Sequence, residues 1–130
     1  MQSPGKRPLL GITMGDPGGV GPEVCAKALE KPEIYRLCRP LIIGDSEIVA
    51  NAIDFCRLSL TVNSCTSPEE GLFSHGTVDV LDLHNLPLSD LQHGTVTPAQ
   101  GRASFEYVER AIALALDGEI DGTVTGPINK

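Results

Sequence analysis

The segment that decides the fold spans residues 9–29 and reads LLGITMGDPGGVGPEVCAKAL. Residues 9–14 form a short apolar run typical of a buried strand, and residues 22–31 carry the pattern of a helix. Pro22 suits the first helical position, where its missing N–H costs nothing, and Glu23 lies favourably against the positive helix end. The segment therefore predicts a strand, a glycine-rich turn and a helix start.

The glycine-rich turn (residues 15–21, GDPGGVG) is the first candidate functional element. It brings backbone N–H groups to the carboxyl end of a strand, where open α/β sheets place their ligands. It is not a dinucleotide fingerprint, because Val24 occupies the place of the third glycine, and not a P-loop, because Pro22 follows Gly21. The alternative interpretation is a tight turn whose glycines only supply positive φ.

The candidate site residues of this turn share its position at the strand terminus: Asp16, Gly18, Gly19 and Gly21. Asp16 is the strongest candidate, because the turn holds its carboxylate at the end of the strand. A carboxylate repels phosphate unless a metal ion or another cation intervenes, so Asp16 argues against a simple phosphate cradle. The turn is therefore predicted to face a ligand whose type the motif leaves open.

A second candidate turn, TGPINK at residues 125–130, also follows a predicted strand. It is expected at the same sheet edge as the glycine-rich turn, because the carboxyl ends of parallel strands meet there. Asn129 offers donors and acceptors, Lys130 offers a cation, and Thr125 opens the turn. A polar or phosphorylated ligand between the two turns is one interpretation, and a turn with a solvated lysine is the other.

Other side chains with chemical potential are interpreted structurally. Asp45 precedes a helical pattern and is expected to cap it. Asp79 and Asp82 are expected on the solvent side of a strand or at its end. No metal ligands are assigned, because the histidines fall in loops or at a strand end and lack the i, i+4 spacing of a helical metal site; they are His75, His84 and His93.

Strand and helix patterns alternate along the chain, which predicts an α/β fold with a largely parallel sheet and helices on both faces. Further strands are expected at residues 40–44, 58–62, 77–83 and 122–125. Further helices are expected over residues 46–56 and 98–117, with a broken turn over 33–38.

The longest helix is expected to be capped by Thr97 and Pro98 and to end at Gly118. Its outer side is expected to pair Glu106 with Arg110. Its core-facing residues are expected to be Phe105, Val108, Ile112 and Ala115.

Composition narrows the function classes. The chain has 130 residues, which fits one domain, and 41% hydrophobic residues, which fits a globular fold. Its net charge of −7 argues against nucleic-acid binding. The sequence carries no apolar run long enough to span a membrane and no secretory signal pattern. Its four cysteines include no C-x-x-C motif, so reduced thiols in a cytoplasmic protein are expected.

The domain organisation is interpreted as a loose leader over residues 1–7 and an incomplete α/β unit over residues 8–130. The last strand lacks a covering helix, which a strand after a crossover normally feeds. The chain is therefore expected to be the N-terminal part of a longer protein. A partner protein that supplies the missing cover is the weaker alternative.

Three motifs occur in the order and at the separation of one family: GITMGDPGGVGPE (residues 11–23), GRASFEYVERA (101–111) and TGPINK (125–130). Together they resemble the 4-hydroxythreonine-4-phosphate dehydrogenase family, PdxA, with its relatives that act on four-carbon sugar-acid phosphates. The resemblance covers essentially the whole chain but only the first part of the family's length.

The resemblance implies oxidation of a secondary alcohol by NAD (or NADP) on a phosphorylated four-carbon hydroxy acid, then decarboxylation, in pyridoxal phosphate (pyridoxine) biosynthesis. It implies a divalent metal (zinc, magnesium or cobalt) held by histidines of both subunits of a homodimer. It also implies a two-lobed fold like that of isocitrate and isopropylmalate dehydrogenases. The family's metal-binding histidines would lie beyond Lys130, so these 130 residues are expected to be inactive alone and to bind neither cofactor.

Three alternatives stay open at this point. The first is a dehydrogenase of the D-threonate or D-erythronate 4-phosphate type. The second is a non-catalytic binding or assembly fragment. The third is a nucleotide-binding module of unrelated function, against which the two failed motif tests count.

Overall fold

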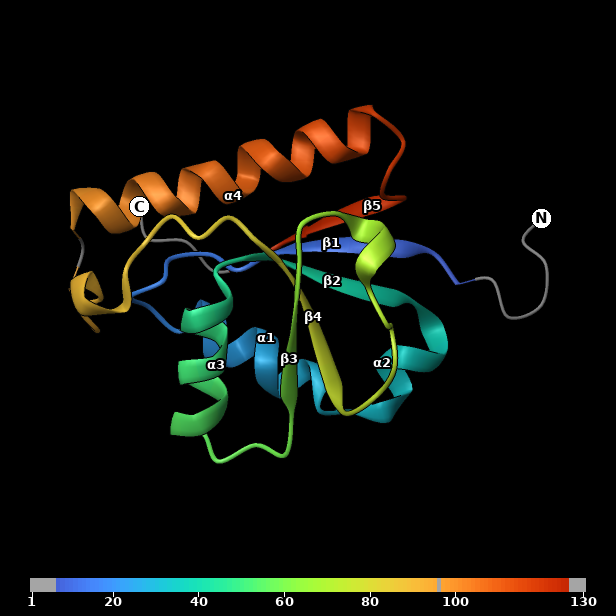
Figure 1. Cartoon of the computed structure of the whole chain (residues 1–130), viewed down its shortest axis with the longest axis horizontal. Coiled ribbons are helices and arrows are strands. Elements are labelled where there is room, and N and C mark those ends of the chain that lie inside the picture. The colour runs from blue at the N-terminus through green and yellow to red at the C-terminus, as the bar shows by residue number, and fades with distance from the viewer. Residues whose placement is uncertain (1–6, 96, 127–130) are drawn as a thin grey trace.

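The computed structural model describes residues 7–95 and 97–126, which are built around one five-stranded sheet (Figure 1). The strand order is β3-β4-β2-β1-β5, and the pairings between neighbours are parallel. The strands are β1 Leu9–Thr13, β2 Arg39–Gly44, β3 Thr61–Cys65, β4 Thr77–Asp82 and β5 Gly122–Thr125.

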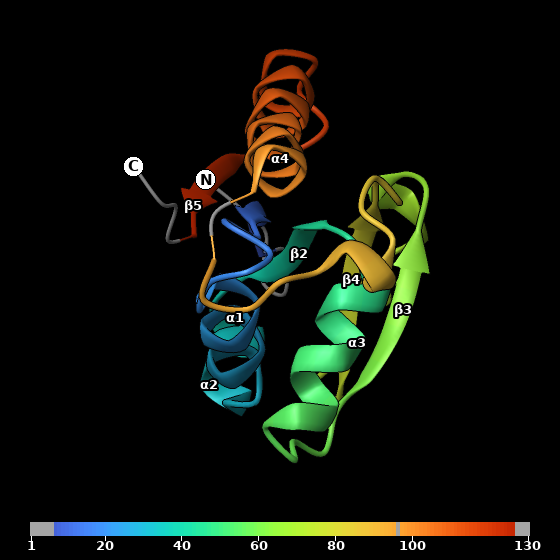
Figure 2. The same ribbon diagram turned by 90° about the vertical axis from the view of Figure 1, so that its left-hand side faces the viewer.

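Helices cover both faces of this sheet (Figure 2). The helix α4 packs on one face, over β1, β2 and β5, and the other three helices lie on the opposite face. The helices are α1 Gly21–Leu29, α2 Pro32–Leu37, α3 Ser46–Phe55 and α4 Pro98–Leu116, and the short 3-10 turns are η1 Pro68–Glu70 and η2 Leu88–Asp90. The predicted fold class is confirmed. The segment predicted as a broken turn is the helix α2, which starts with a proline in its first turn.

The third strand begins later than predicted, because the residues after α3 form a turn that closes onto the end of that helix. Arg57 adopts a left-handed φ of 56°, and the Leu58 amide donates to the Ile53 carbonyl at 3.0 Å. This hydrogen bond belongs to the Schellman motif, which ties the residue after the left-handed position to the last turn of a helix. The strand therefore starts at Thr61 rather than at residue 58.

The prediction about the inward face of α4 is wrong, because Phe105 is 62% exposed and Ile112 is 53% exposed. Another stripe packs on the sheet and consists of Gln100, Ala103, Tyr107, Ala111 and Leu114. The Tyr107 hydroxyl donates to Asn85 Oδ1 at 3.0 Å, so the one large polar ring in this stripe is satisfied when buried. The alanines on either side of it let the helix approach the sheet closely.

Glu106 also has a different partner in the structure from the predicted Arg110. Its carboxylate accepts a hydrogen bond from Asn85 Nδ2 at 2.8 Å instead of facing Arg110 across one turn. Asn85 follows β4 in the chain, so this hydrogen bond shows that the side of α4 with Glu106 is the side toward β4.

Asp79 corrects another prediction, because it is 0% exposed instead of facing solvent. Its carboxylate accepts hydrogen bonds from the amides of Leu72 and Phe73, at 3.0 and 2.8 Å, and from Asn63 Nδ2 at 2.9 Å. These bonds hold the connection between β3 and β4 against the sheet. Asp79 is therefore part of the architecture, and the desolvation of its charge is offset by charge-assisted hydrogen bonds.

The first and last strands lie side by side in the sheet. The Leu9 amide donates to an oxygen of the Asp121 carboxylate, and the Asp121 amide donates to the Leu9 carbonyl, both at 2.7 Å. β1 is thereby enclosed between β2 and β5.

The four cysteines are free thiols in the structure, and three of them are buried. Burial raises the pKa of Cys25 and of Cys65 to about 11, so neither is a reactive thiolate at neutral pH. Within the described residues, no helix combines the length and apolar character needed to cross a membrane.

Candidate functional site at the carboxyl edge of the sheet

Asp16 closes the glycine-rich turn on itself. It is 7% exposed, and its Oδ1 accepts a hydrogen bond from the Gly18 amide at 2.9 Å. The Gly19 amide donates to the Asp16 backbone carbonyl at 3.0 Å. A side chain that accepts from the amide two residues on mimics a backbone turn. The structure therefore places the carboxylate at the strand end, as predicted, and gives it a turn-forming role.

The turn is packed too tightly for side chains at two of its glycines. A Cβ atom on Gly21 would lie 2.1 Å from the Met14 carbonyl oxygen. A Cβ atom on Gly18 would lie 2.4 Å from Gln100 Nε2. Gly19 is different, because its nearest neighbours would lie at an ordinary 3.6 Å. Close approach of neighbouring atoms, rather than positive φ, explains Gly18 and Gly21, because a Cβ atom on Gly18 would also lie 2.5 Å from the Gln92 carbonyl oxygen.

The second candidate turn begins directly beside the first, as predicted. Thr125 pairs with Thr13 in the sheet, and the Gly126 amide donates to the Thr13 carbonyl at 2.9 Å. A Cβ atom on Gly126 would lie 2.4 Å from that same carbonyl oxygen. Asn129 and Lys130 lie outside the described residues.

Gln100 is the residue at this edge that sequence reasoning missed. It is 0% exposed, its Oε1 accepts from the Gln92 amide at 2.6 Å, and its Nε2 donates to the Thr95 carbonyl at 2.7 Å. The Gly94 amide in the same loop donates to the Gly18 carbonyl at 2.8 Å. Gln100 therefore holds the loop before α4 over the glycine-rich turn.

The sequence carried a signal for a helix cap at this position, but none for the loop contacts of the Gln100 side chain. Thr97 and Gln100 form the T-x-x-Q pattern of a capping box. The Thr97 hydroxyl does accept from the Gln100 amide, at 3.2 Å, which confirms the predicted cap. The glutamine side chain departs from the standard motif, because it binds the loop rather than the amide of the capping residue.

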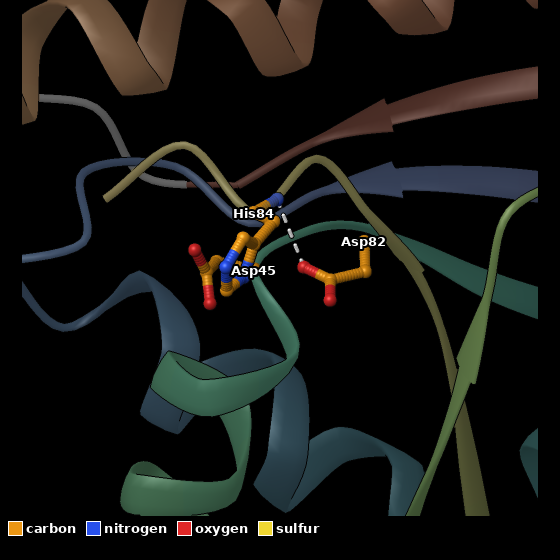
Figure 3. Close-up of side chains that lie close together, drawn as sticks. All are labelled: Asp45, Asp82 and His84. Atoms are coloured by element: carbon orange, nitrogen blue, oxygen red, sulfur yellow. Dashed lines mark hydrogen bonds between the residues drawn. The ribbon is translucent and has the colours of Figure 1, made fainter. Parts of the chain in front are cut away.

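A second polar group lies at the same edge, where β2 and β4 end (Figure 3). The ligand atoms of Asp45, Asp82 and His84 all lie within 4.8 Å of one another. The connections after β1 and β2 lead to helices on one face of the sheet, whereas the connection after β4 leads to α4 on the other face. Open α/β sheets bind ligands at such a point, where neighbouring strands are connected to opposite faces. His84 is an exposed loop residue, as predicted, with a left-handed φ of 48°.

Hydrogen bonds within the chain account for both carboxylates of this group. Asp45 caps α3, as predicted, by accepting from the Glu47 amide at 3.0 Å, and it also accepts from the Leu86 amide at 3.3 Å. Asp82 Oδ1 accepts from the amides of Ser46 and His84, at 3.1 and 2.9 Å. Burial raises the pKa of Asp45, and the neighbouring charge of Asp82 raises it further, while the amide hydrogen bonds oppose the rise.

The fit of this group to a metal ion is incomplete. Two carboxylates and an imidazole are donors that divalent metals accept. Both carboxylates, however, are engaged in starting α3 and in shaping the loop after β4. Local structure accounts for the cluster, and we assign no metal chemistry to it.

The fit of the described residues to a dinucleotide is also poor. The amides of Gly18 and Gly19 are directed to Asp16, and Gly21 is pressed against the end of β1. A pyrophosphate site needs amides that point outward at a helix N-terminus. The amides of Gly18 and Gly19 are therefore not free to cradle a pyrophosphate.

Comparisons with known proteins give a consistent result. Residues 36–130 match the family described as pyridoxal phosphate biosynthetic protein PdxA. A putative D-threonate 4-phosphate dehydrogenase of Symbiobacterium thermophilum is 52% identical over 95% of this chain and 37% of its own length. A protein of the same description from Clostridium botulinum is 42% identical over 95% of this chain and 37% of its own length.

A solved structure shares the fold closely. The 4-hydroxythreonine-4-phosphate dehydrogenase of Burkholderia phymatum superimposes with a TM-score of 0.92 at 38% identity, over 96% of this chain and 38% of that chain. The chain thus spans 37% of the length of the curated relatives reported above.

Proposed function

Because the chain belongs to the PdxA family, we propose that the full-length protein is a dehydrogenase that oxidises a four-carbon hydroxy acid 4-phosphate, with D-threonate 4-phosphate as the first candidate substrate. The observation that carries this proposal is the 52% identity, over 95% of this chain, with a relative of that description. D-Threonate 4-phosphate and D-erythronate 4-phosphate share this chemistry and differ only in stereochemistry.

A second candidate substrate is 4-hydroxythreonine 4-phosphate, in pyridoxal phosphate biosynthesis. The family description and the solved structure at 38% identity favour it. Both candidates carry a secondary alcohol and a terminal phosphate, so the same oxidation followed by decarboxylation applies to each. A non-catalytic binding or assembly role is the remaining alternative.

The proposal extends to NAD or NADP as the oxidant, to a divalent metal (zinc, magnesium or cobalt) and to a cytoplasmic homodimer without nucleic-acid or membrane partners. When bound, the nicotinamide would accept the hydride and the metal would polarise the alcohol oxygen. The described residues form neither a dinucleotide cradle nor a dedicated metal site, so we derive no step of the reaction through these groups.

The part of this chain in the reaction is to build one wall of the substrate site. In this proposal Asp16 fixes the glycine-rich turn, and Thr125 leads the second turn out beside it. Asn129 and Lys130 would then contact the phosphorylated substrate, because a lysine ammonium attracts phosphate as a point charge.

The experiment compares the two substrates on the purified full-length protein, with formation of NADH or NADPH as the readout. We expect kcat/KM to be at least about tenfold higher for D-threonate 4-phosphate, which corresponds to roughly 1.4 kcal/mol of transition-state binding. Preference for 4-hydroxythreonine 4-phosphate would select the second candidate. Binding of either substrate without turnover, with each metal and coenzyme supplied, would favour the non-catalytic role.

Residues 1–130 alone provide the matching control. We expect no turnover from them with either substrate, even with zinc or magnesium added. Turnover above background that a chelator abolishes would show that the site is complete within this chain, contrary to the proposal.

A further inference from the structure

The helix α4 carries a second apolar stripe that is largely exposed in the described part of the chain. Phe105, Ile112 and Leu116 are 62%, 53% and 83% exposed, and Val108 between them is partly exposed. Residues three or four positions apart are neighbours on a helix surface, so these four side chains form one continuous stripe. A helix with apolar residues on its outer side as well as its inner side is typical of a buried helix.

The direction of this stripe follows from hydrogen bonds of its neighbours. Glu106 lies on the flank toward β4, because it binds Asn85, and Tyr107 points to the sheet. Successive helical residues are separated by about 100°, so Val108 lies on the flank opposite Glu106. The stripe therefore begins on the side of α4 toward β5 and continues around its outer surface.

The neighbouring strand β5 extends the same surface. It is the end strand of the described sheet and lies beside α4, so one edge of it is open there (Figure 2). An open strand edge beside an exposed apolar stripe is a surface that proteins normally cover. We call this the α4–β5 surface, and it consists of Phe105, Val108, Ile112, Leu116 and the open edge of β5 (Gly122–Thr125).

We infer that the polypeptide following β5 in the full-length protein packs on the α4–β5 surface. The matched part makes up 37% of the S. thermophilum relative and 38% of the B. phymatum structure, so most of each of those chains lies outside it. A segment tethered to β5 loses less freedom on docking than a separate molecule does, because its effective concentration is high. The inference depends on the proposed function only in requiring that longer chain.

The test measures thiol accessibility in the full-length protein with two neighbouring variants, Ile112→Cys and Ala113→Cys. Both positions are exposed in the described structure, and Ala113 lies on the outer side toward Glu106 instead of in the stripe. We expect a maleimide to label Ile112→Cys at least about tenfold more slowly than Ala113→Cys under native conditions, after subtraction of the wild-type background. Leu116→Cys repeats the measurement if Ile112→Cys does not fold.

Three outcomes would overturn the inference. One is equal labelling of the stripe and control positions. Another is protection that disappears when the protein is diluted to a monomer, because a second copy would then be the covering partner. The third is a reading frame that stops at Lys130. Labelling does not require turnover, so an active enzyme with an accessible stripe refutes this inference alone, and an inactive protein with a protected stripe refutes the proposed function alone.

Discussion

The glycine-rich turn after β1 and the Asp45–Asp82–His84 cluster lie at the same edge of the sheet but are held in different ways. Backbone contacts too close for a side chain fix the turn, with Gln100 bracing it from a distant helix. Hydrogen bonds to nearby amides fix the cluster. The comparison teaches that added volume should damage the turn, whereas altered charge or protonation should affect the cluster.

The largest effect is expected from Gly21→Ala. Its new methyl group would lie 2.1 Å from a backbone oxygen, which cannot move aside as a flexible side chain does. We expect a loss of about 3 kcal/mol or more in the free energy of unfolding, measured by urea denaturation. Gly19→Ala is the matched control and should change it by less than about 0.5 kcal/mol. Equal losses from the two variants would contradict the steric account of the turn.

The next effect is expected from Gln100→Ala. This change leaves the Gln92 amide and the Thr95 carbonyl without their buried partner, which should cost about 2 kcal/mol in the same assay. Gln92→Ala removes a side chain of the same length but keeps its backbone amide, and it should stay within about 0.5 kcal/mol of wild type. If Gln100→Ala is as stable as that control, the loop does not depend on Gln100.

Asp16→Asn separates the shape of the turn from its charge. Asparagine keeps an oxygen that accepts from the Gly18 amide, so the melting temperature should stay nearly unchanged. If the proposed activity holds and the carboxylate acts on the substrate, kcat/KM of the full-length protein should fall at least about tenfold, or roughly 1.4 kcal/mol. Wild-type kinetics, or activity lost only in proportion to folding, would make Asp16 purely architectural.

The smallest effect is a pH dependence at Asp45. Its pKa is raised in the folded state, so the folded protein binds this proton more tightly than the unfolded chain does. The stabilisation from this bound proton is fully present below the pKa that Asp45 has in the unfolded chain. It is lost as the pH rises through the higher pKa that Asp45 has in the folded protein.

The measurement is urea unfolding of wild type and Asp45→Asn across acidic and neutral pH. As pH falls, the free energy of unfolding of the wild type should rise relative to that of the variant. The variant also lacks the Leu86 hydrogen bond, which lowers its free energy of unfolding by a similar amount at every pH. A difference between the two proteins that stays constant with pH would mean that Asp45 does not titrate in this way.

Much of the fold was predictable because local signals agreed with the tertiary structure. The strand before the glycine-rich turn, the caps at Asp45 and Thr97, and the stop at Gly118 each follow from a short sequence pattern. The family resemblance and the adjacency of the two candidate turns were likewise available from motifs.

The errors arose where local patterns were compatible with two outcomes. The helix α4 has two apolar stripes, and periodicity alone favoured the one with Phe105 over the one with Tyr107. Asp79 looks like a solvent-facing strand residue until the β3–β4 connection folds back and supplies its amides. Gln100 required knowledge of which distant loop would lie against the glycine-rich turn.

The enclosure of β1 between β2 and β5 has a consequence for synthesis on the ribosome. Leu9 leaves the exit tunnel early, yet its hydrogen-bonding partner Asp121 is made more than a hundred residues later. One edge of the first strand must therefore wait, unpaired, while the intervening helices form. Contacts this distant in sequence slow folding, so the nascent chain should depend on chaperone protection of that edge until the last strand emerges.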